Sequence, residues 1–147
     1  MFYQASQFNG DISQWDVSNV TDMQEMFNNA SSFLTSIDNW DTSSLENMQN
    51  MFIGAYRFNR DISFKPWVAL WWADAWDTSN VTNMAWALSY NPFFNQDISN
   101  WDTSNVENMN SLFAGANKFN QDISNWDTSN VTNMHGMLNN ATDFWYD

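Results

Sequence analysis

A phrase that opens with tryptophan and aspartate recurs along this chain at an almost fixed interval. The phrase reads Trp-Asp-(Thr/Val)-Ser-(Asn/Ser)-(Val/Leu)-x-(Asn/Asp)-Met, and it begins at Trp15, Trp40, Trp76, Trp101 and Trp126. Three of the four intervals are 25 residues, and the one from Trp40 to Trp76 is 36, which is one period plus an insertion of 11 residues. A fixed period of about 20–50 residues is typical of a solenoid, in which each unit stacks on the next.

The repeat extends over the whole sequence, so one domain accounts for residues 1–147. A length of 147 residues suits a single domain, and a hydrophobic content of 44% is ample for a core. We expect a single solenoid repeat domain of about five coils, with the insertion 64–75 in the third coil and incomplete repeats at both ends. Because the sequence starts and stops within a repeat and shows no polar caps, we expect a trimmed fragment or an engineered chain.

The residues after each tryptophan phrase predict a short helix. In the last unit, the apolar side chains from Val131 to Ala141 recur at intervals of three and four residues, as on one face of a helix. A serine stands just ahead of each such face, where a helix needs a hydroxyl to accept its free N–H groups. The predicted N-cap residues are Ser18, Ser43, Ser79, Ser104 and Ser129.

The residues before each tryptophan predict a short strand, because an isoleucine alternates there with polar neighbours. These isoleucines are Ile12, Ile37, Ile62, Ile98 and Ile123. One strand and one helix per repeat make up the coil of a leucine-rich repeat, and parallel strands joined by crossovers coil to the right. The predicted fold class is α/β: a right-handed leucine-rich-repeat-like solenoid with one short parallel strand and one short helix per 25-residue coil.

The phrase that begins at Phe119, Phe-Asn-Gln-Asp-Ile-Ser-Asn-Trp-Asp-Thr-Ser-Asn-Val-Thr-Asn-Met, resembles the repeat of mycoplasma-type surface lipoproteins. These are relatives of BspA-like leucine-rich-repeat surface proteins. The resemblance covers nearly the whole chain except residues 64–75. It implies a leucine-rich-repeat-like solenoid, displayed extracellularly or at the cell surface for adhesion or recognition, and it brings no catalytic motif. The chain itself carries no export signal and no apolar run long enough to span a membrane.

Composition argues against several kinds of function. The net charge of -13 repels phosphate backbones, so we expect no nucleic-acid partner. There is no cysteine, and His135 is the single histidine, with no serine-nucleophile motif or glycine-rich phosphate loop beside it. We therefore expect no catalytic residues, no metal site and no cofactor. Aspartates that recur once per coil, such as Asp16 and Asp41, are interpreted as partners of turn amides and helix N-termini rather than as calcium ligands.

The third unit departs from the others. Its insertion runs Phe-Lys-Pro-Trp-Val-Ala-Leu-Trp-Trp-Ala-Asp-Ala, and aromatic side chains follow at positions that are polar or small in most other units. Tryptophan, tyrosine and arginine dominate binding hot spots, and basic residues favour a ligand with an anionic group. The predicted binding residues are Arg57, Arg60, Phe64, Lys65, Trp67, Leu70, Trp71, Trp72, Trp86, Tyr90 and Phe93.

These features favour a non-catalytic surface recognition or adhesion scaffold that presents the aromatic insertion to a protein or to an apolar ligand carrying an anionic group. One alternative is an engineered or designed repeat scaffold with a grafted ligand-binding insertion. Another is a purely structural array that self-associates through the insertion or the uncapped ends. The insertion could also fold onto its own coil, beside Ala87 and Leu88, and remain part of the core.

Overall fold

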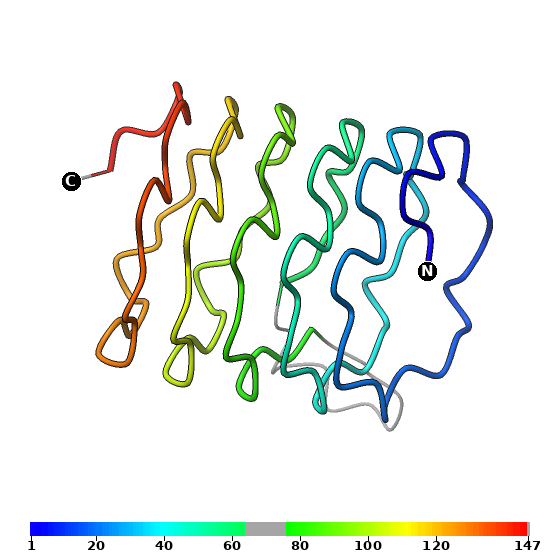
Figure 1. Cartoon of the computed structure of the whole chain (residues 1–147), viewed down its shortest axis with the longest axis horizontal. Helices are drawn as coiled ribbons and strands as arrows, with labels where there is room; N and C mark the ends of the chain where they lie inside the picture. The colour runs from blue at the N-terminus through cyan, green and yellow to red at the C-terminus, as the bar shows by residue number, and fades with distance from the viewer. Residues whose placement is uncertain (64–75, 147) are drawn as a thin grey trace.

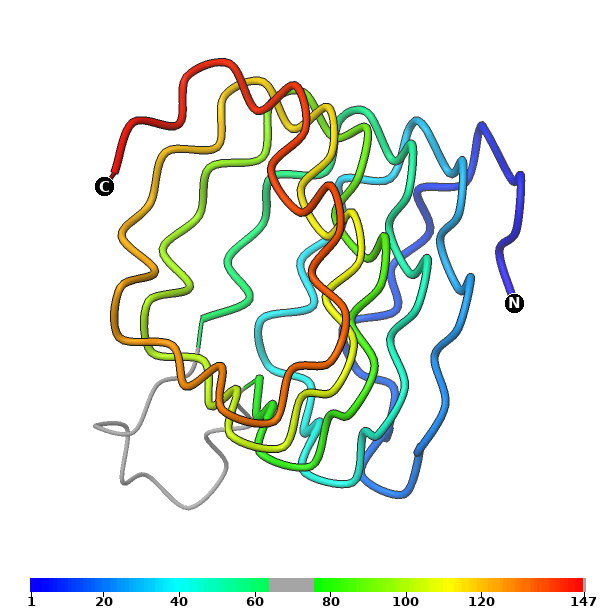
Figure 2. The same ribbon diagram turned by 60° about the vertical axis from the view of Figure 1, so that its left-hand side comes forward.

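In the computed structural model, residues 1–63 and 76–146 are described, and they wind into a stack of coils. Counted from the phenylalanine of each unit, the coils span 8–32, 33–57, 58–93, 94–118 and 119–143. They follow one another in chain order, so that the N-terminus lies at one end of the stack and the C-terminus at the other (Figure 1). The turned view shows the coils lying face to face around a common interior (Figure 2).

The predicted helices and strands are absent from the described residues. In these residues there is no α-helix and no extended strand, and the pairing consists of isolated parallel bridges between equivalent residues of successive coils. These bridges join Asp22 to Asn47, Asn47 to Asn83, Asn83 to Asn108 and Asn108 to Asn133. The predicted α/β leucine-rich-repeat-like solenoid, with one strand and one helix per coil, is therefore wrong. The handedness rule used for it governs strands of a sheet joined by crossovers, so it has no basis here.

Successive β-turns take the place of the predicted helix. In the first coil, the N–H of Met26 donates to the carbonyl of Met23 at 3.1 Å, which closes a turn. The third residue of this turn, Glu25, has a φ of 57°, and Asn29 in the following turn has a φ of 56°. Because a right-handed helix needs negative φ at every residue, two such residues in each coil prevent a helix.

Alternate N–H groups of the same segment bond to the next coil. The N–H groups of Met23, Glu25, Phe27 and Asn29 donate to carbonyls of the second coil at distances of 2.7–3.0 Å. Backbone groups are thus satisfied between coils, as in a sheet, rather than along a helix. Turns of this kind also bury every third or fourth residue, which explains why the apolar spacing imitated a helix face.

The serines predicted as helix N-caps serve turns instead. The N–H and the Oγ of Ser18 both donate to Oδ1 of Asp16, at 3.1 and 2.6 Å. The same N–H bond joins Ser43 to Asp41, Ser79 to Asp77, Ser104 to Asp102 and Ser129 to Asp127. These are Asx turns, in which a short side chain replaces a backbone acceptor. The interpretation of the aspartates as partners of turn amides agrees with these bonds, whereas their proposed role at helix N-termini is wrong.

Aromatic ladders fill the interior of the stack. Within the first coil and its successor, Phe27 and Phe33 stack with ring centroids 4.1 Å apart, and Phe27 lies 5.5 Å from Phe52 of the next coil. The indole N–H of each buried tryptophan donates to an isoleucine carbonyl of the preceding coil. These bonds, at 2.8–3.1 Å, join Trp40 to Ile12, Trp76 to Ile37, Trp101 to Ile62 and Trp126 to Ile98. The tryptophan phrase therefore sets the register between coils.

The third coil is irregular inside as well as outside. Leu88 stands where the first, second and fourth coils stack a phenylalanine, and Asn91 stands where the other four coils bury an alanine. The side-chain amide of Asn91 donates to the carbonyl of Phe52 at 2.7 Å, but its buried Oδ1 has no partner. Ser89 is also buried, and its hydroxyl donates to the carbonyl of Ser111.

Candidate functional site

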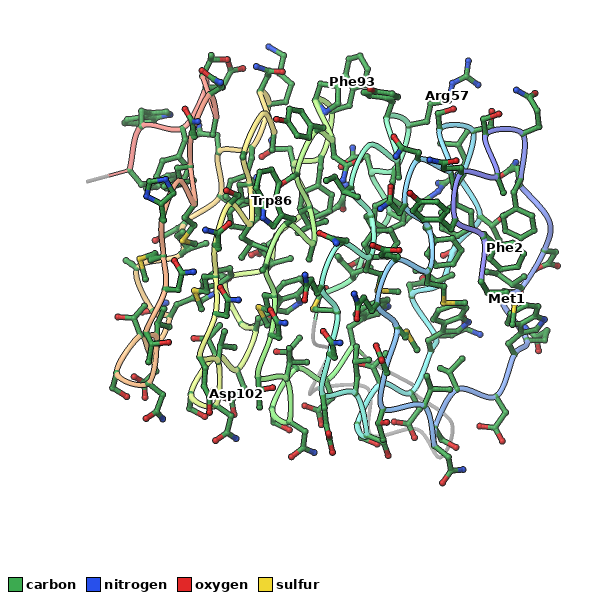
Figure 3. All side chains as sticks on the ribbon, in the orientation of Figure 1. Met1, Phe2, Arg57, Trp86, Phe93 and Asp102 are labelled. Atoms are coloured by element: carbon green, nitrogen blue, oxygen red, sulfur yellow. The ribbon has the colours of Figure 1, made fainter. Side chains whose placement is uncertain are left out.

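Three predicted site residues form an aromatic surface on the third coil. Trp86 is partly buried, whereas Tyr90 is 50% exposed and Phe93 is 61% exposed. In Figure 3, Phe93 lies on the upper edge of the stack and Trp86 on the face below it. We call Trp86, Tyr90 and Phe93 the third-coil aromatic surface.

The backbone conformation of this surface is unusual for such large side chains. Trp86 has a φ of 60° and Tyr90 a φ of 53°. At the position of Trp86 the other coils carry Glu25, Asn50, Ser111 and Gly136, and at that of Tyr90 they carry Asn29, Gly54, Gly115 and Asn140. Positive φ suits glycine and asparagine but is an outlier for a bulky residue, and it costs about 1–3 kcal/mol at each position.

Small neighbours leave the two rings room. The rings of Trp86 and Tyr90 are nearly parallel, with 24° between their planes and 6.4 Å between their centroids. A Cβ on Gly115 would lie 3.0 Å from Cδ1 of Tyr90, so the tyrosine ring rests directly on that glycine. The N–H of Trp86 still donates to the carbonyl of Asn110 at 2.8 Å, so the bonding between coils continues beneath the rings.

Neutral polar groups border the rings. The hydroxyl of Tyr90 and the side-chain amide of Asn110 make no hydrogen bond with the described residues. Asn50 and Ser111, which hold the position of Trp86 on the two neighbouring coils, are also uncharged, but the amide of Asn50 donates to Oε1 of Glu25 at 3.4 Å and Ser111 is buried. The surface therefore combines aromatic rings with a tyrosine hydroxyl that has no partner among the described residues.

A cation without a partner among residues 1–63 and 76–146 lies at the edge of this surface. Arg57 is exposed, occupies in the second coil the position that Phe93 holds in the third, and makes no hydrogen bond or ion pair with the described residues. Lys118, at the same position of the fourth coil, is paired with Asp143 at 2.8 Å. The Nε of Arg60 donates to the carbonyl of Leu34. Of these three cations, Lys118 forms an ion pair among the described residues, Arg60 contacts an uncharged carbonyl, and Arg57 has no partner among the described residues.

The predicted residues of the insertion lie outside the described residues. They are Phe64, Lys65, Trp67, Leu70, Trp71 and Trp72. The insertion joins the third coil at Trp76, the equivalent of Trp101. Asp102, directly after Trp101, lies at the lower edge of the stack in Figure 3, opposite Phe93 and Arg57. The described junction of the insertion and the third-coil aromatic surface are thus on different edges of the stack, and a shared site remains a prediction.

Sequence reasoning missed Tyr56, which directly precedes Arg57 and is 50% exposed. The other coils carry Ser31, Pro92, Asn117 and Thr142 at this position. A comparison of equivalent positions, which identified Trp86 and Tyr90, would have identified Tyr56 as well. It extends the aromatic character of the upper edge from the third coil to the second.

The recurrent aspartates are engaged in the fold. The hydroxyl and N–H of Ser18 lower the pKa of Asp16, and Ser129 lowers the pKa of Asp127 in the same way. Among the described residues, no three histidine or acidic side chains gather in a group that could hold a metal ion. The same residues include no helix with the length and apolar character needed to cross a membrane.

Comparison with known proteins identifies a family. The profile described as "Mycoplasma protein of unknown function, DUF285" matches the chain twice, over residues 1–70 and 68–147. No curated protein and no solved structure matches the chain. The resemblance to a mycoplasma-type repeat family is thereby confirmed, while the finer likeness to BspA-like leucine-rich-repeat proteins receives no support from the match.

Proposed function

We propose that this chain, which belongs to the Mycoplasma protein family DUF285, is a non-catalytic recognition module. Its regular coils hold the third-coil aromatic surface in place, and that surface binds a partner. The observation that carries the proposal is the positive φ of Trp86 and Tyr90. Two large aromatic residues occupy positions at which neighbouring coils carry glycine, serine or asparagine.

Backbone strain of this kind persists only where the surrounding structure holds the residue in place. Asparagine or glycine at these two positions would relieve about 1–3 kcal/mol each. The regular coils carry glycine or asparagine at the Tyr90 position and Glu25, Asn50, Ser111 or Gly136 at the Trp86 position, and they keep the same hydrogen bonds, so the aromatic rings are not needed for the stack. Strained residues cluster at binding and active sites. Exposed Tyr90 and Phe93, beside a partly buried Trp86, also have the composition of a binding hot spot.

The partner is a protein or a ligand with an apolar face, bound outside the cell or at its surface. Arg57, which has no partner among the described residues, adds a guanidinium at the edge, and this group suits an anionic group on that partner. The predicted binding residues of the insertion, Lys65, Trp67 and Trp71 among them, lie outside the described residues, and their part in binding stays a prediction. The surface location follows the resemblance to mycoplasma-type surface lipoproteins.

Replacing the strained rings with the residues of other coils tests this role. We expect Trp86→Asn with Tyr90→Gly to lower the binding of fluorescently labelled chain to cultured animal cells at least about tenfold, the loss typical of hot-spot aromatics. The same double variant should raise the free energy of unfolding by about 2 kcal/mol, because strain is relieved at both positions. Binding is measured by flow cytometry and stability by urea denaturation.

Trp145→Asn is the matched control. Trp145 is 72% exposed and stands where every coil but the second carries asparagine, but it lies beyond the fifth coil. Its replacement also removes an exposed aromatic ring, and we expect it to leave cell binding unchanged. Equal loss of binding in both variants would show that exposed aromatic rings bind the cells non-specifically. Unchanged binding of the double variant, or no cell binding by the unmodified chain, would overturn the proposed function.

A further inference from the structure

The first coil contains the dipeptide Asn9–Gly10, and asparagine is followed by glycine nowhere else in the sequence. The third, fourth and fifth coils repeat the asparagine but follow it with a larger residue, as Asn59–Arg60, Asn95–Gln96 and Asn120–Gln121. We propose that Asn9 is a site of spontaneous self-modification, at which the backbone nitrogen of Gly10 attacks the side-chain amide and the asparagine becomes isoaspartate. This site is independent of the third-coil aromatic surface.

The reaction needs only the chain and water. The nitrogen of Gly10 gives up its proton to hydroxide and forms a bond to Cγ of Asn9. The bond from Cγ to Nδ2 breaks, the departing nitrogen takes up a proton and leaves as ammonia, and a succinimide ring remains. Water then adds to either ring carbonyl and opens the ring, which yields aspartate or isoaspartate. In isoaspartate the main chain passes through Cβ and Cγ, so the backbone is longer by one atom.

The backbone nitrogen of Gly10 is open to this reaction. Gly10 is exposed, and its N–H makes no hydrogen bond with residues 1–63 and 76–146. A glycine has no Cβ to shield its nitrogen, and its backbone reaches conformations that other residues avoid. Arginine or glutamine at this position, as in the third to fifth coils, brings a long side chain beside the attacking atom. The residue after the asparagine therefore favours attack in the first coil.

The amide of Asn9 is held by its oxygen. Oδ1 accepts the N–H of Leu34 at 2.7 Å and the hydroxyl of Thr35 at 3.2 Å. Such donors stabilise the negative charge that a carbonyl oxygen gains when a nucleophile adds to its carbon. The departing Nδ2 makes no hydrogen bond with the described residues. Oδ1 of Asn59 and of Asn95 also accepts two donors, so Gly10 is what distinguishes the first coil.

Conversion weakens the contact between the first and second coils. The longer backbone moves the acceptor away from the N–H of Leu34, which lies in the second coil. It also displaces Phe8, because a Cβ on Gly10 would lie 3.1 Å from Cε2 of that ring, and the ring thus rests on this backbone. The ring centroid of Phe8 lies 5.9 Å from that of Phe33 in the second coil. A chain that has reacted therefore holds its first coil less firmly.

Incubation of the purified chain in mildly alkaline water labelled with oxygen-18 tests the modification. Peptide mass spectrometry detects it, because the new carboxyl group carries one oxygen from water, and an isoaspartyl methyltransferase labels the isoaspartate. We expect Asn9 to react at least about tenfold faster than Asn59, Asn95 and Asn120, which corresponds to a barrier lower by about 1.4 kcal/mol. Gly10→Gln, which gives Asn9 the neighbour found in the fourth and fifth coils, should abolish the difference.

Deuterium exchange after the incubation measures the effect on the fold. We expect reacted chains to exchange faster in residues 8–32 and at an unchanged rate in residues 94–118. Asn9→Asp adds a carboxylate without lengthening the backbone, and we expect this variant to exchange like the unmodified chain. Equal reaction rates at the four asparagines, or an unchanged rate at Asn9 in Gly10→Gln, would overturn the modification site. Equal exchange in reacted and unreacted chains would overturn its effect on the coil contact.

Discussion

At the scale of single residues, Asn91 is a polar residue at a position that the regular coils fill with alanine. It is fully buried, and its Oδ1 has no partner. We predict that Asn91→Ala raises the free energy of unfolding by about 1 kcal/mol, because an unpaired buried acceptor costs about 1–3 kcal/mol. The carbonyl of Phe52 loses the amide but keeps the N–H of Ala55, at 3.0 Å. Urea denaturation measures the change.

Ser89 supplies the matched control for this prediction. It is equally buried, but its hydroxyl donates to the carbonyl of Ser111. Ser89→Ala removes a satisfied hydrogen bond, and we expect it to lower the free energy of unfolding. A loss of stability in both variants would show that the hydrogen bond from the Asn91 amide to Phe52 stabilises the fold by more than the unpaired Oδ1 destabilises it.

The aspartate–serine turns make the stability depend on pH. The serine two residues on lowers the pKa of Asp11, Asp16, Asp122 and Asp127 in the folded chain, through bonds from its hydroxyl and its N–H. A folded pKa below the unfolded one stabilises the fold above the unfolded pKa, and this contribution is lost as the pH falls through the folded pKa. We therefore predict that these turns weaken below about pH 4, where the unfolded carboxyl begins to take up its proton.

Replacement of these four aspartates by asparagine tests the pH dependence. Asparagine keeps the acceptor: Oδ1 of Asn47 accepts the N–H of Gln49 at 3.1 Å in a turn of the same kind. We expect the urea midpoint of the unmodified chain to fall more between pH 5 and pH 3 than that of the variant. An equal fall in both proteins would assign the pH dependence to other groups.

At the scale of elements, a single glycine distinguishes a turn from a helix. Gly136 has a φ of 64° and lies in the segment predicted as the last helix. In a helix, Gly→Ala stabilises by about 1 kcal/mol. We predict that Gly136→Ala instead lowers the free energy of unfolding by about 1 kcal/mol, because an alanine is strained at positive φ. Gly136→Asn should cost clearly less, since asparagine tolerates this conformation. A higher free energy of unfolding for Gly136→Ala would contradict the turn and favour the predicted helix.

The same elements show what the sequence could and could not reveal. The period and the insertion could be predicted from the sequence. Each coil needs the same tryptophan phrase, because its indole bonds to the carbonyl of Ile12 or an equivalent isoleucine and so sets the register. The β-turns could not be predicted, because an i, i+3, i+4 spacing of buried residues fits a helix and a series of turns equally well. The distinction lies in where the N–H of Met23 bonds, and its partner is Asn47 in another coil. The glycine or asparagine that recurs at one position of the repeat, as Asn29, Gly54 and Gly115, indicates positive φ, and the prediction of a helix did not use it.

The candidate site was partly readable for a related reason. Trp86, Tyr90 and Phe93 differ from their equivalents in the other units, and that comparison needs no structure. Their backbone strain could not be predicted, because it depends on turns that the sequence pattern did not reveal. The joint site with Trp67 and Trp71 of the insertion stays a prediction, since both lie outside the described residues.

At the scale of the whole molecule, each coil is bonded to its neighbours along the stack. The N–H groups of Met48 and Phe52 donate to carbonyls of the third coil, in the middle of the array, whereas those of Phe2 and Gln4 donate to the first. Stability in such arrays is a sum of coil and interface contributions. We predict that the amides of Met48 and Phe52 exchange with deuterium more slowly than those of Phe2 and Gln4, as mass spectrometry of exchanged peptides would show.

A truncated core residue in one coil tests the range of this coupling. Trp126→Ala removes the indole bond to Ile98 and a buried ring of the fifth coil. We expect faster exchange in residues 119–143 and unchanged exchange in residues 8–32. A uniform increase over the described residues would show that the stack opens as one cooperative unit, contrary to a nearest-neighbour array.

The direction of the bonds between coils has a mechanical consequence. Bonds such as those from Met23 to Asn47 and from Phe27 to Met51 run along the axis that also separates the two ends of the chain (Figure 1). The coil interfaces therefore lie in series, so that each one bears the whole load applied to the two ends instead of sharing it with the others. The weakest interface peels first, and each freed 25-residue coil lengthens the chain by about 80 Å. A stack built this way unfolds under load one coil at a time, while the remaining coils stay folded.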